Sequence, residues 1–254
     1  MLLLLPPSET KRPGGVPGSR LELGALRYPM LTDARRATLD AVAALAQDRE
    51  ASVAALGLGP TQRGEVEKNR VLESSELLPA ADRYTGVLYD ALDAVSLPRP
   101  ARERLGRHVV IHSAVLGPVG ALDGIPDYRL AHDAKLPGLR LKALWADAAA
   151  AALAAEAELV LDARSQSYAA LGPAPHAVRL EVVAEDGRGR RRALNHFNKH
   201  AKGELARAFA LSGENPRTVA ELTDWGAAHG LRLEAAEPGP GGRVARVTLV
   251  TVRS

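Results

Sequence analysis

The chain has 254 residues, a formal net charge of +3 and no cysteine. Hydrophobic residues make up 46% and charged residues 25%, which is ordinary for a folded soluble protein, and the length allows one large core or two small ones. The absence of cysteine excludes disulfides, thiolate zinc sites and cysteine nucleophiles, so a redox role cannot be direct thiol chemistry.

The first half of the chain predicts one buried strand and then mainly helices. Residues 1–5 (MLLLL) are stopped by two prolines and are too short for a signal sequence or a membrane span, so a buried strand is expected. No later stretch approaches the ~20 apolar residues of a transmembrane helix, and we expect a cytoplasmic protein. A loop at 12–20 precedes predicted helices, which span 32–46, a short stretch from about 48, 61–73 and 79–92. We interpret residues 32–76 as a helical hairpin insertion.

The second half predicts strands interspersed with helices. Strands are expected at 108–115, 158–162, 178–185, 191–197 and 243–252, helices at 139–156, 199–211 and 216–229, and a loop at 117–137. The turn 186–189 (DGRG) joins the third and fourth of these strands as a hairpin. We therefore predict a mixed α/β (α+β) fold over 1–254, a single domain with a mixed sheet covered by helices.

Polar residues follow three of the predicted strands. Ser8 to Lys11 follow the first, Ser113 ends the second, and the cluster Asp162 to Tyr168 lies at the end of the third. The carboxyl ends of strands are the usual ligand sites of open α/β sheets, so these groups are expected to share a site. A solvated turn is the alternative for 8–11. The candidate catalytic residues are Ser8, Glu9, Lys11, Ser113, Tyr128 and Ser165.

Gly86 interrupts the predicted helix 79–92. Glycine within a helix costs about 1 kcal/mol relative to alanine and usually marks the close approach of a backbone or a ligand. Tyr84 and Tyr89 beside it either pack in the core or present hydroxyls to a cleft.

Positive charge is concentrated between residues 188 and 207, a window that contains seven basic residues and only one acidic residue, Glu204. Lys199 and Lys202, three residues apart near a helix start, can bind an anion together with free amide donors. The run Arg188 to Arg192 is either part of such a surface or a solvated hairpin tip. His196 and His200 lack a nearby cysteine or clear carboxylate ligand, so we expect no metal site, and no cofactor either.

Residues 56–60 (LGLGP) lie between two predicted helices. A hydrophobic-Gly-hydrophobic-Gly turn resembles the helix-hairpin-helix element, in which backbone amides at positions such as Gly57 and Gly59 bind a DNA phosphate. A plain connection between helices is the alternative.

Six motifs in order resemble the YaaA family of bacterial peroxide stress proteins. Residues 1–11 are similar to the family's opening strand and S-P-A-K-T motif, in the P-P-S-E-T-K form of actinobacterial members. The others are 83–86 (RYTG) for Y-T-G, 128–130 for Y-R-L, 144–147 (LWAD) for F-W-x-D, Ser165 and Tyr168 for S-x-x-Y, and 198–203 (NKHAKG) for A-K-K-A-R-G. The order of the motifs is kept from residue 1 to about 210, whereas Ala131 replaces the acid that follows Y-R-L in the family.

The resemblance implies the so-called cantaloupe fold with a helix-hairpin-helix element and a positively charged cleft. It also implies DNA binding and a role in limiting damage by hydrogen peroxide and iron.

Two functions remain open. The first is binding of duplex or single-stranded DNA, mainly at phosphates, by a monomer without membrane contact. Its anion-binding residues would be Lys11, Gly57, Gly59, Tyr84, Thr85, Arg129, Ser165, Tyr168, Lys199 and Lys202. The second is an enzyme acting on a nucleotide or another phosphorylated small molecule in the same cleft, because the candidate groups are more varied than phosphate binding requires. A plain interaction protein is a further alternative.

Overall fold

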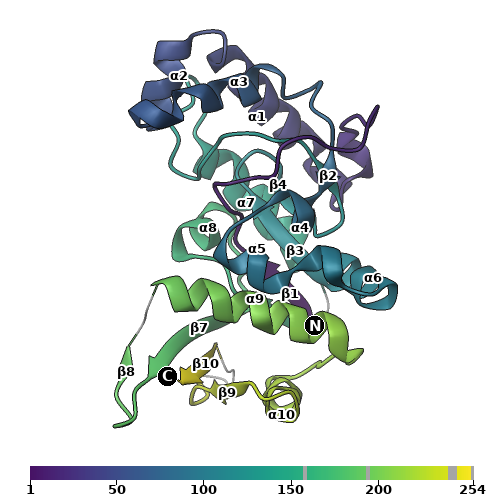
Figure 1. The fold of residues 1–254 in the computed structure, drawn as a ribbon, viewed down its shortest axis with the longest axis vertical. Coiled ribbons are helices and arrows are strands. Elements are labelled where there is room, and N and C mark those ends of the chain that lie inside the picture. Colours follow the sequence, from purple (N-terminus) through teal and green to yellow (C-terminus); the bar gives the residue numbers. More distant parts are fainter. Residues whose placement is uncertain (157–158, 193–194, 240–244, 253–254) are drawn as a thin grey trace.

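An eight-stranded mixed sheet forms the centre of the structure, a computed structural model that describes residues 1–156, 159–192, 195–239 and 245–252 (Figure 1). In spatial order the strands are β4 (Gly117–Gly120), β3 (Val109–Ser113), β1 (Leu2–Leu5), β6 (Val160–Asp162), β7 (Val178–Glu185), β10 (Arg246–Val252) and β9 (Arg232–Ala235), with β8 (Arg191–Arg192) paired to β7. The five strands from β3 to β10 are parallel, and β4, β8 and β9 join antiparallel. The predicted mixed sheet is confirmed.

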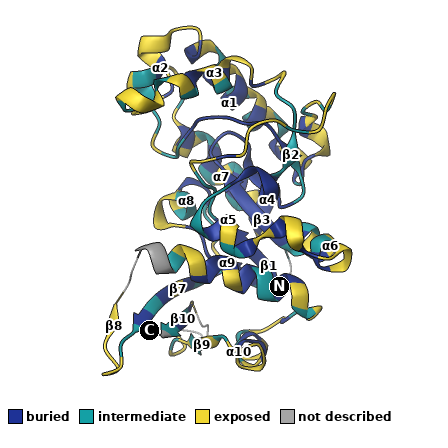
Figure 2. Cartoon of the chain, in the orientation of Figure 1, coloured by how far each residue is buried: buried dark blue, intermediate teal, exposed yellow. Residues whose placement is uncertain are grey.

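The central strands are buried on both faces. Every residue of β1 and β3 is buried, as expected for parallel strands that are covered by helices on both sides (Figure 2). β7 alternates between buried and more exposed residues along most of its length.

Two groups of helices pack around the sheet. In one, α9 (Asn195–Ser212) packs on α5 (Val87–Leu92), α6 (Arg99–His108) and β7. In the other, α7 (Leu141–Ala154) packs on β4, α8 (Gln166–Leu171) and α1 (Thr32–Leu45). None of the helices in the described ranges is long and apolar enough to cross a membrane.

A helical layer lies at the top of Figure 1, formed by α1, α2 (Arg49–Ala55), a 3-10 segment (Pro60–Glu65) and α3 (Val66–Arg70). Leu39 and Val42 of α1 belong to the same hydrophobic core as the strands, so the layer is part of one domain. The remaining elements are α4 (Ala80–Arg83), α10 (Val219–Ala228), the pair β2 (Leu78–Pro79) and β5 (Gly124–Ile125), and 3-10 turns at Leu23–Ala25, Pro29–Leu31 and Ala94–Ser96.

The predicted helix 79–92 is wrong in its middle. α4 ends at Arg83, Tyr84 is extended and pairs with Lys11, and Gly86 has a φ of 94° before α5 begins. A backbone in this left-handed region favours glycine, so Gly86 separates two helices instead of lying within one.

Other boundaries also differ. The expected loop 117–137 contains β4 and β5, and α6 and β9 were not predicted. The expected strand 191–197 is wrong after β8, because residues 195–197 already belong to α9, while 193–194 lie outside the described residues. Residues 158 and 243–244 of two other expected strands also lie outside the described part.

Candidate functional site

The strands β3, β1 and β6 are adjacent and parallel. Leu5 is in register with Ile111, and Leu4 with Asp162, so the three carboxyl ends meet at one edge of the sheet. The segments that follow these ends carry the polar residues predicted to converge. We call this region the carboxyl edge.

A hydroxyl cluster of Ser8, Thr10 and Thr85 lies beside this edge and is partly open to solvent. Thr85 Oγ1 donates to Thr10 Oγ1 at 3.0 Å, and the Thr10 and Ser8 hydroxyls are 3.2 Å apart. A Cβ at Gly86 would lie 3.6 Å from Thr10 Oγ1 and 3.7 Å from Ser8 Oγ. These three hydroxyls are therefore close enough together to hydrogen-bond to the oxygen atoms of one bound group.

Lys11 lies next to this cluster and is buried. Its Nζ donates to the carbonyls of Ser8 and Glu9, at 3.3 Å each, and sits 4.0 Å from the centre of the Tyr128 ring and 5.4 Å from that of Tyr84. Burial lowers the pKa of Lys11 from 10.5 to about 7. The carbonyls and the aromatic faces favour the ammonium, but they do not replace the water that a lysine normally has.

A chain of hydroxyls runs behind Lys11. Ser113 Oγ is 2.8 Å from Tyr128 Oη, which is 2.7 Å from Tyr84 Oη. Burial raises the pKa of both tyrosines well above 10, so both stay protonated. We call these three residues the tyrosine chain.

Four of the five tyrosines gather here. Tyr89 donates to the Pro6 carbonyl at 2.7 Å and packs against Tyr84. Tyr168 lies close enough to Tyr128 and Glu9 for their charges to affect its pKa, which burial raises above 10. In a chain with 4% aromatic residues, this concentration is a property of the site and not of the composition.

Charged groups flank the tyrosine chain on the side of α3. Arg129 Nη2 donates to Glu9 Oε2 at 2.9 Å, and the Arg129 backbone exchanges two hydrogen bonds with the Asn69 amide. Lys68 lies 3.4 Å from Asp127 Oδ2, while Asp127 Oδ1 is buried without a hydrogen-bond partner among the described residues. Asn69 thus ties the Arg129 backbone to α3.

A second group, which we call the β6 cluster, lies at the end of β6. Arg164 donates twice to Asp162, at 2.9 Å each, and its Nη1 lies 2.9 Å from His112 Nδ1. Since a guanidinium only donates, His112 Nδ1 must accept and the proton must be on Nε2. Burial and the neighbouring Arg164 lower the pKa of His112 well below 6.5, so the imidazole is neutral.

Lys202 of α9 reaches the β6 cluster. It is 7% exposed, and its pKa is lowered from 10.5 to about 8, mainly by burial and also by Arg179, while Asp162 acts in the opposite direction. Arg179 itself is 4.0 Å from Asp162. With Arg164 bound to the same carboxylate, the cluster carries more cations than anions.

Other predicted residues lie apart from these groups. Lys199 is exposed on α9, Ser165 is exposed and caps α8 by accepting from the Tyr168 amide at 3.4 Å, and the side chain of His196 lies outside the described part. At the 56–60 turn, the amide of Gly57 donates to the Ala54 carbonyl and that of Gly59 to Gln62 Oε1. The amide donors at both glycines are therefore already hydrogen-bonded.

The hairpin arginines are largely paired within their own hairpin and sheet. Arg190 binds Asp186 at 3.0 Å, and Arg191 binds Glu185 at 2.9 Å and Glu234 at 2.7 Å. The pairing of Arg190 and Arg191 with carboxylates therefore favours the interpretation of this run as a solvated hairpin tip over that of an anion-binding surface.

Sequence reasoning did not select His112, and it included Arg164 only as a member of the cluster Asp162 to Tyr168, without a role. The sequence does contain a signal for both residues. His112 follows three consecutive apolar residues of a buried strand, and Asp162 and Arg164 are two residues apart at the end of another. Buried charges normally require partners, so either residue pointed to a buried polar group.

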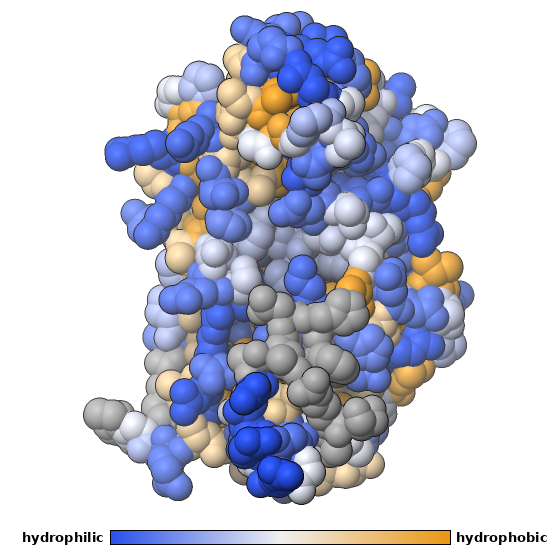
Figure 3. All heavy atoms as spheres, turned by 60° about the vertical axis from the view of Figure 1, so that its left-hand side comes forward, coloured by the Kyte–Doolittle hydropathy of each residue, from blue (hydrophilic) through white to orange (hydrophobic). Residues whose placement is uncertain are grey.

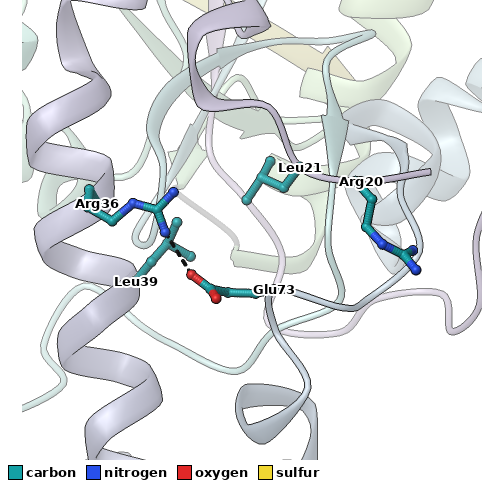
Figure 4. A pocket seen from close by; sticks show the side chains of 5 residues that line it. All are labelled: Arg20, Leu21, Arg36, Leu39 and Glu73. Carbon is teal, nitrogen blue, oxygen red and sulfur yellow. Dashed lines mark hydrogen bonds and ion pairs between the residues drawn. The ribbon is translucent and has the colours of Figure 1, made fainter. Parts of the chain in front are cut away.

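A cavity of about 270 Å³ lies elsewhere, lined by Arg20, Leu21, Arg36, Leu39 and Glu73 (Figure 4). Arg36 and Glu73 pair across it at 2.7 Å. It contains none of the predicted site residues. The face in Figure 3 is mostly hydrophilic, with apolar atoms in small separate groups.

Comparisons with known proteins identify the family. The family described as "Peroxide stress protein YaaA" matches residues 1–237, beyond the end of the six motifs. A UPF0246 protein of Corynebacterium efficiens is 44% identical over 255 residues, covering 98% of this chain and 100% of the relative. A UPF0246 protein of Streptomyces coelicolor is 42% identical over 249 residues, covering 96% and 95%. The chain belongs to the family of the peroxide stress protein YaaA.

Proposed function

We propose that the protein acts in the response to peroxide by binding DNA at its phosphates through the carboxyl edge, and so limits damage by hydrogen peroxide and iron. The observation that carries this proposal is the meeting of three parallel strands at one edge, beside a cluster of hydroxyls and several cations. Hydroxyl and cationic side chains are the groups that contact phosphate oxygens in protein–DNA complexes.

The cations suit an anionic partner. Only 7% of the surface of Lys202 is exposed, yet no carboxylate lies within ion-pair distance of its amine in the described structure. Lys199 precedes it by one helical turn and is exposed. A DNA phosphate at the carboxyl edge would supply a countercharge to Lys202, and Lys199 would add a solvent-exposed contact on the same helix, as expected for DNA binding that depends on salt.

Three finer points remain proposals: a helix-hairpin-helix contact at Gly57 and Gly59, the cantaloupe fold, and a positively charged cleft. For the first, a phosphate would have to displace the Gln62 side chain from the Gly59 amide. We therefore assign the main phosphate contacts to the carboxyl edge.

The test is a fluorescence anisotropy titration of labelled duplex and single-stranded DNA at several salt concentrations. Lys199→Gln and Lys202→Gln should weaken binding of all sequences alike and reduce the salt slope by about 1 each. Lys142→Gln removes the same charge from an exposed position on α7 and should leave the slope unchanged. If wild-type protein binds neither DNA form at low salt, the proposal is wrong.

A second candidate is an enzyme acting on a nucleotide or another phosphorylated small molecule. It is favoured by the enclosed Lys11 and tyrosine chain, because phosphate binding alone does not require a buried amine beside polarised hydroxyls. Binding of nucleotides, but not of DNA, in the same titration would favour this candidate.

A further inference from the structure

The tyrosine chain has a direction. Ser113 Oγ accepts from the amides of Val115 at 3.2 Å and Leu116 at 3.0 Å, which occupies both of its lone pairs. Its proton is therefore free to go to Tyr128 Oη, and Tyr128 in turn donates to Tyr84 Oη. Ser113 also lies within hydrogen-bond reach of Tyr84, but its lone pairs are occupied, so the Tyr84 proton has no free acceptor among the described residues, although Tyr84 is only 2% exposed.

A buried phenol proton without an acceptor is costly unless a ligand oxygen takes it. Two hydroxyls stand behind Tyr84 and polarise it, which makes it a stronger donor. The chain is thus arranged to donate a hydrogen bond or a proton at the Tyr84 end.

The Lys11 amine lies over the rings of this chain, 4.0 Å from the centre of the Tyr128 ring and 5.4 Å from that of Tyr84. Its hydrogen bonds among the described residues are two contacts of 3.3 Å to backbone carbonyls, and the Lys11 backbone pairs with Tyr84 in a β-bridge. Asp127 and Glu65 raise its pKa, Lys68 and Arg129 lower it, and burial dominates, so the pKa is about 7. The lowered pKa favours a neutral, nucleophilic amine closer to neutral pH than in an ordinary lysine.

We propose that Lys11 is a catalytic nucleophile that forms an imine with the aldehyde or ketone of a phosphate-bearing ligand, with Tyr84 as the acid. The amine nitrogen attacks the carbonyl carbon and gives a carbinolamine. The C–O bond then breaks, and the oxygen leaves as water with the two protons of the amine, one of them passed through Tyr84. No oxidant or reductant is needed.

The hydroxyl cluster indicates the class of ligand. Lys11 Nζ donates to the Ser8 carbonyl at 3.3 Å, and Thr10 and Thr85 adjoin Lys11 and Tyr84 in the sequence. The hydroxyl cluster can therefore take the phosphate of a ligand whose carbonyl reaches the amine. This identification of the ligand rests on the proposed DNA binding. The ligand is an abasic site in DNA, where the sugar that has lost its base opens to an aldehyde and lies between two phosphates.

The experiment is trapping with sodium borohydride, which reduces an imine to a stable amine. The full-length protein is incubated with a duplex containing one abasic site, with the intact duplex, and separately with glyceraldehyde 3-phosphate, and the adduct is located by mass spectrometry. We expect an adduct on Lys11 with the abasic duplex and with glyceraldehyde 3-phosphate, and none with the intact duplex.

Variants separate chemistry from folding. Lys11→Arg should remove the adduct, and Tyr84→Phe should slow trapping about 100-fold, the size of a general acid contribution. Lys142→Arg, at an exposed lysine, should change nothing. The trapping rate should rise with pH around 7 and not around 10.5, a profile that a purely structural lysine would not give.

The outcomes are distinguishable. Binding of the duplexes with no adduct on Lys11 from either probe, or equal labelling of Lys142 and Lys199, overturns this inference and leaves DNA binding intact. Trapping of glyceraldehyde 3-phosphate on Lys11 without any DNA binding supports the amine chemistry and removes the proposed function.

Discussion

At the scale of single residues, buried arginines organise the loops around the site. Arg83 is fully buried and has no carboxylate partner in the described structure; its guanidinium instead donates to four backbone carbonyls, those of Arg12, Gly14, Glu76 and Ile125. These carbonyls belong to three separate segments. Arg83 therefore holds the chain that follows Lys11 against Tyr84.

Replacing Arg83 with methionine should lower the free energy of unfolding by about 3 kcal/mol, because buried carbonyls lose their donors. Arg83→Lys should recover only part of this, since an ammonium lacks the planar fork. The measurement is urea unfolding followed by circular dichroism. Arg99→Met, at a side chain that is 91% exposed, should stay within about 0.5 kcal/mol of wild type. An equally small effect at Arg83 would contradict the role given to it.

At the scale of elements, the crossing of α5 and α9 positions the lysines of α9. A Cβ at Gly203 would lie 2.2 Å from the Leu88 carbonyl oxygen and 2.7 Å from the Ala91 side chain. Only glycine allows this approach, and the residue before it in α9 is Lys202. The close packing therefore sets how far Lys202 reaches toward β6.

Gly203→Ala should destabilise the protein by about 2 kcal/mol, since the two helices must move apart. Helix propensity alone predicts the opposite sign, a gain of about 1 kcal/mol. Thermal unfolding distinguishes the two. Gly64→Ala, where an added Cβ meets nothing within 4 Å, serves as the matched control.

At the scale of the whole molecule, local patterns predicted the central strands and their shared edge. The apolar runs of β1 and β3 are long enough to identify buried parallel strands, and the polar residues after them mark the carboxyl edge. The break at Tyr84 was missed because its bridge to Lys11 joins segments far apart in the sequence. For the same reason the contacts of Lys11 with Tyr128, and of Arg164 with His112, could not be predicted: tertiary packing creates them.

Global stability should depend on pH through the buried lysines. The pKa of Lys202 falls from 10.5 in the unfolded chain to about 8 in the folded one, so the unfolded chain binds more protons between these values. The free energy of unfolding therefore increases as the pH rises from about 8 to 10.5, and this gain is lost as the pH falls back through 8. In urea unfolding, the stability of wild type relative to Lys202→Met should increase between pH 7 and pH 9.5. A constant difference would show that Lys202 is not desolvated.

The central position of β1 has a consequence for biosynthesis. Its partners on either side are β3 and β6, and about 100 residues separate Leu5 from Ile111. At roughly 5–20 residues per second, a ribosome needs several seconds to make that distance. During this time four consecutive leucines have no sheet to join, and such an apolar segment favours aggregation. A nascent chain of this protein should therefore depend on a ribosome-associated chaperone until β6 has emerged.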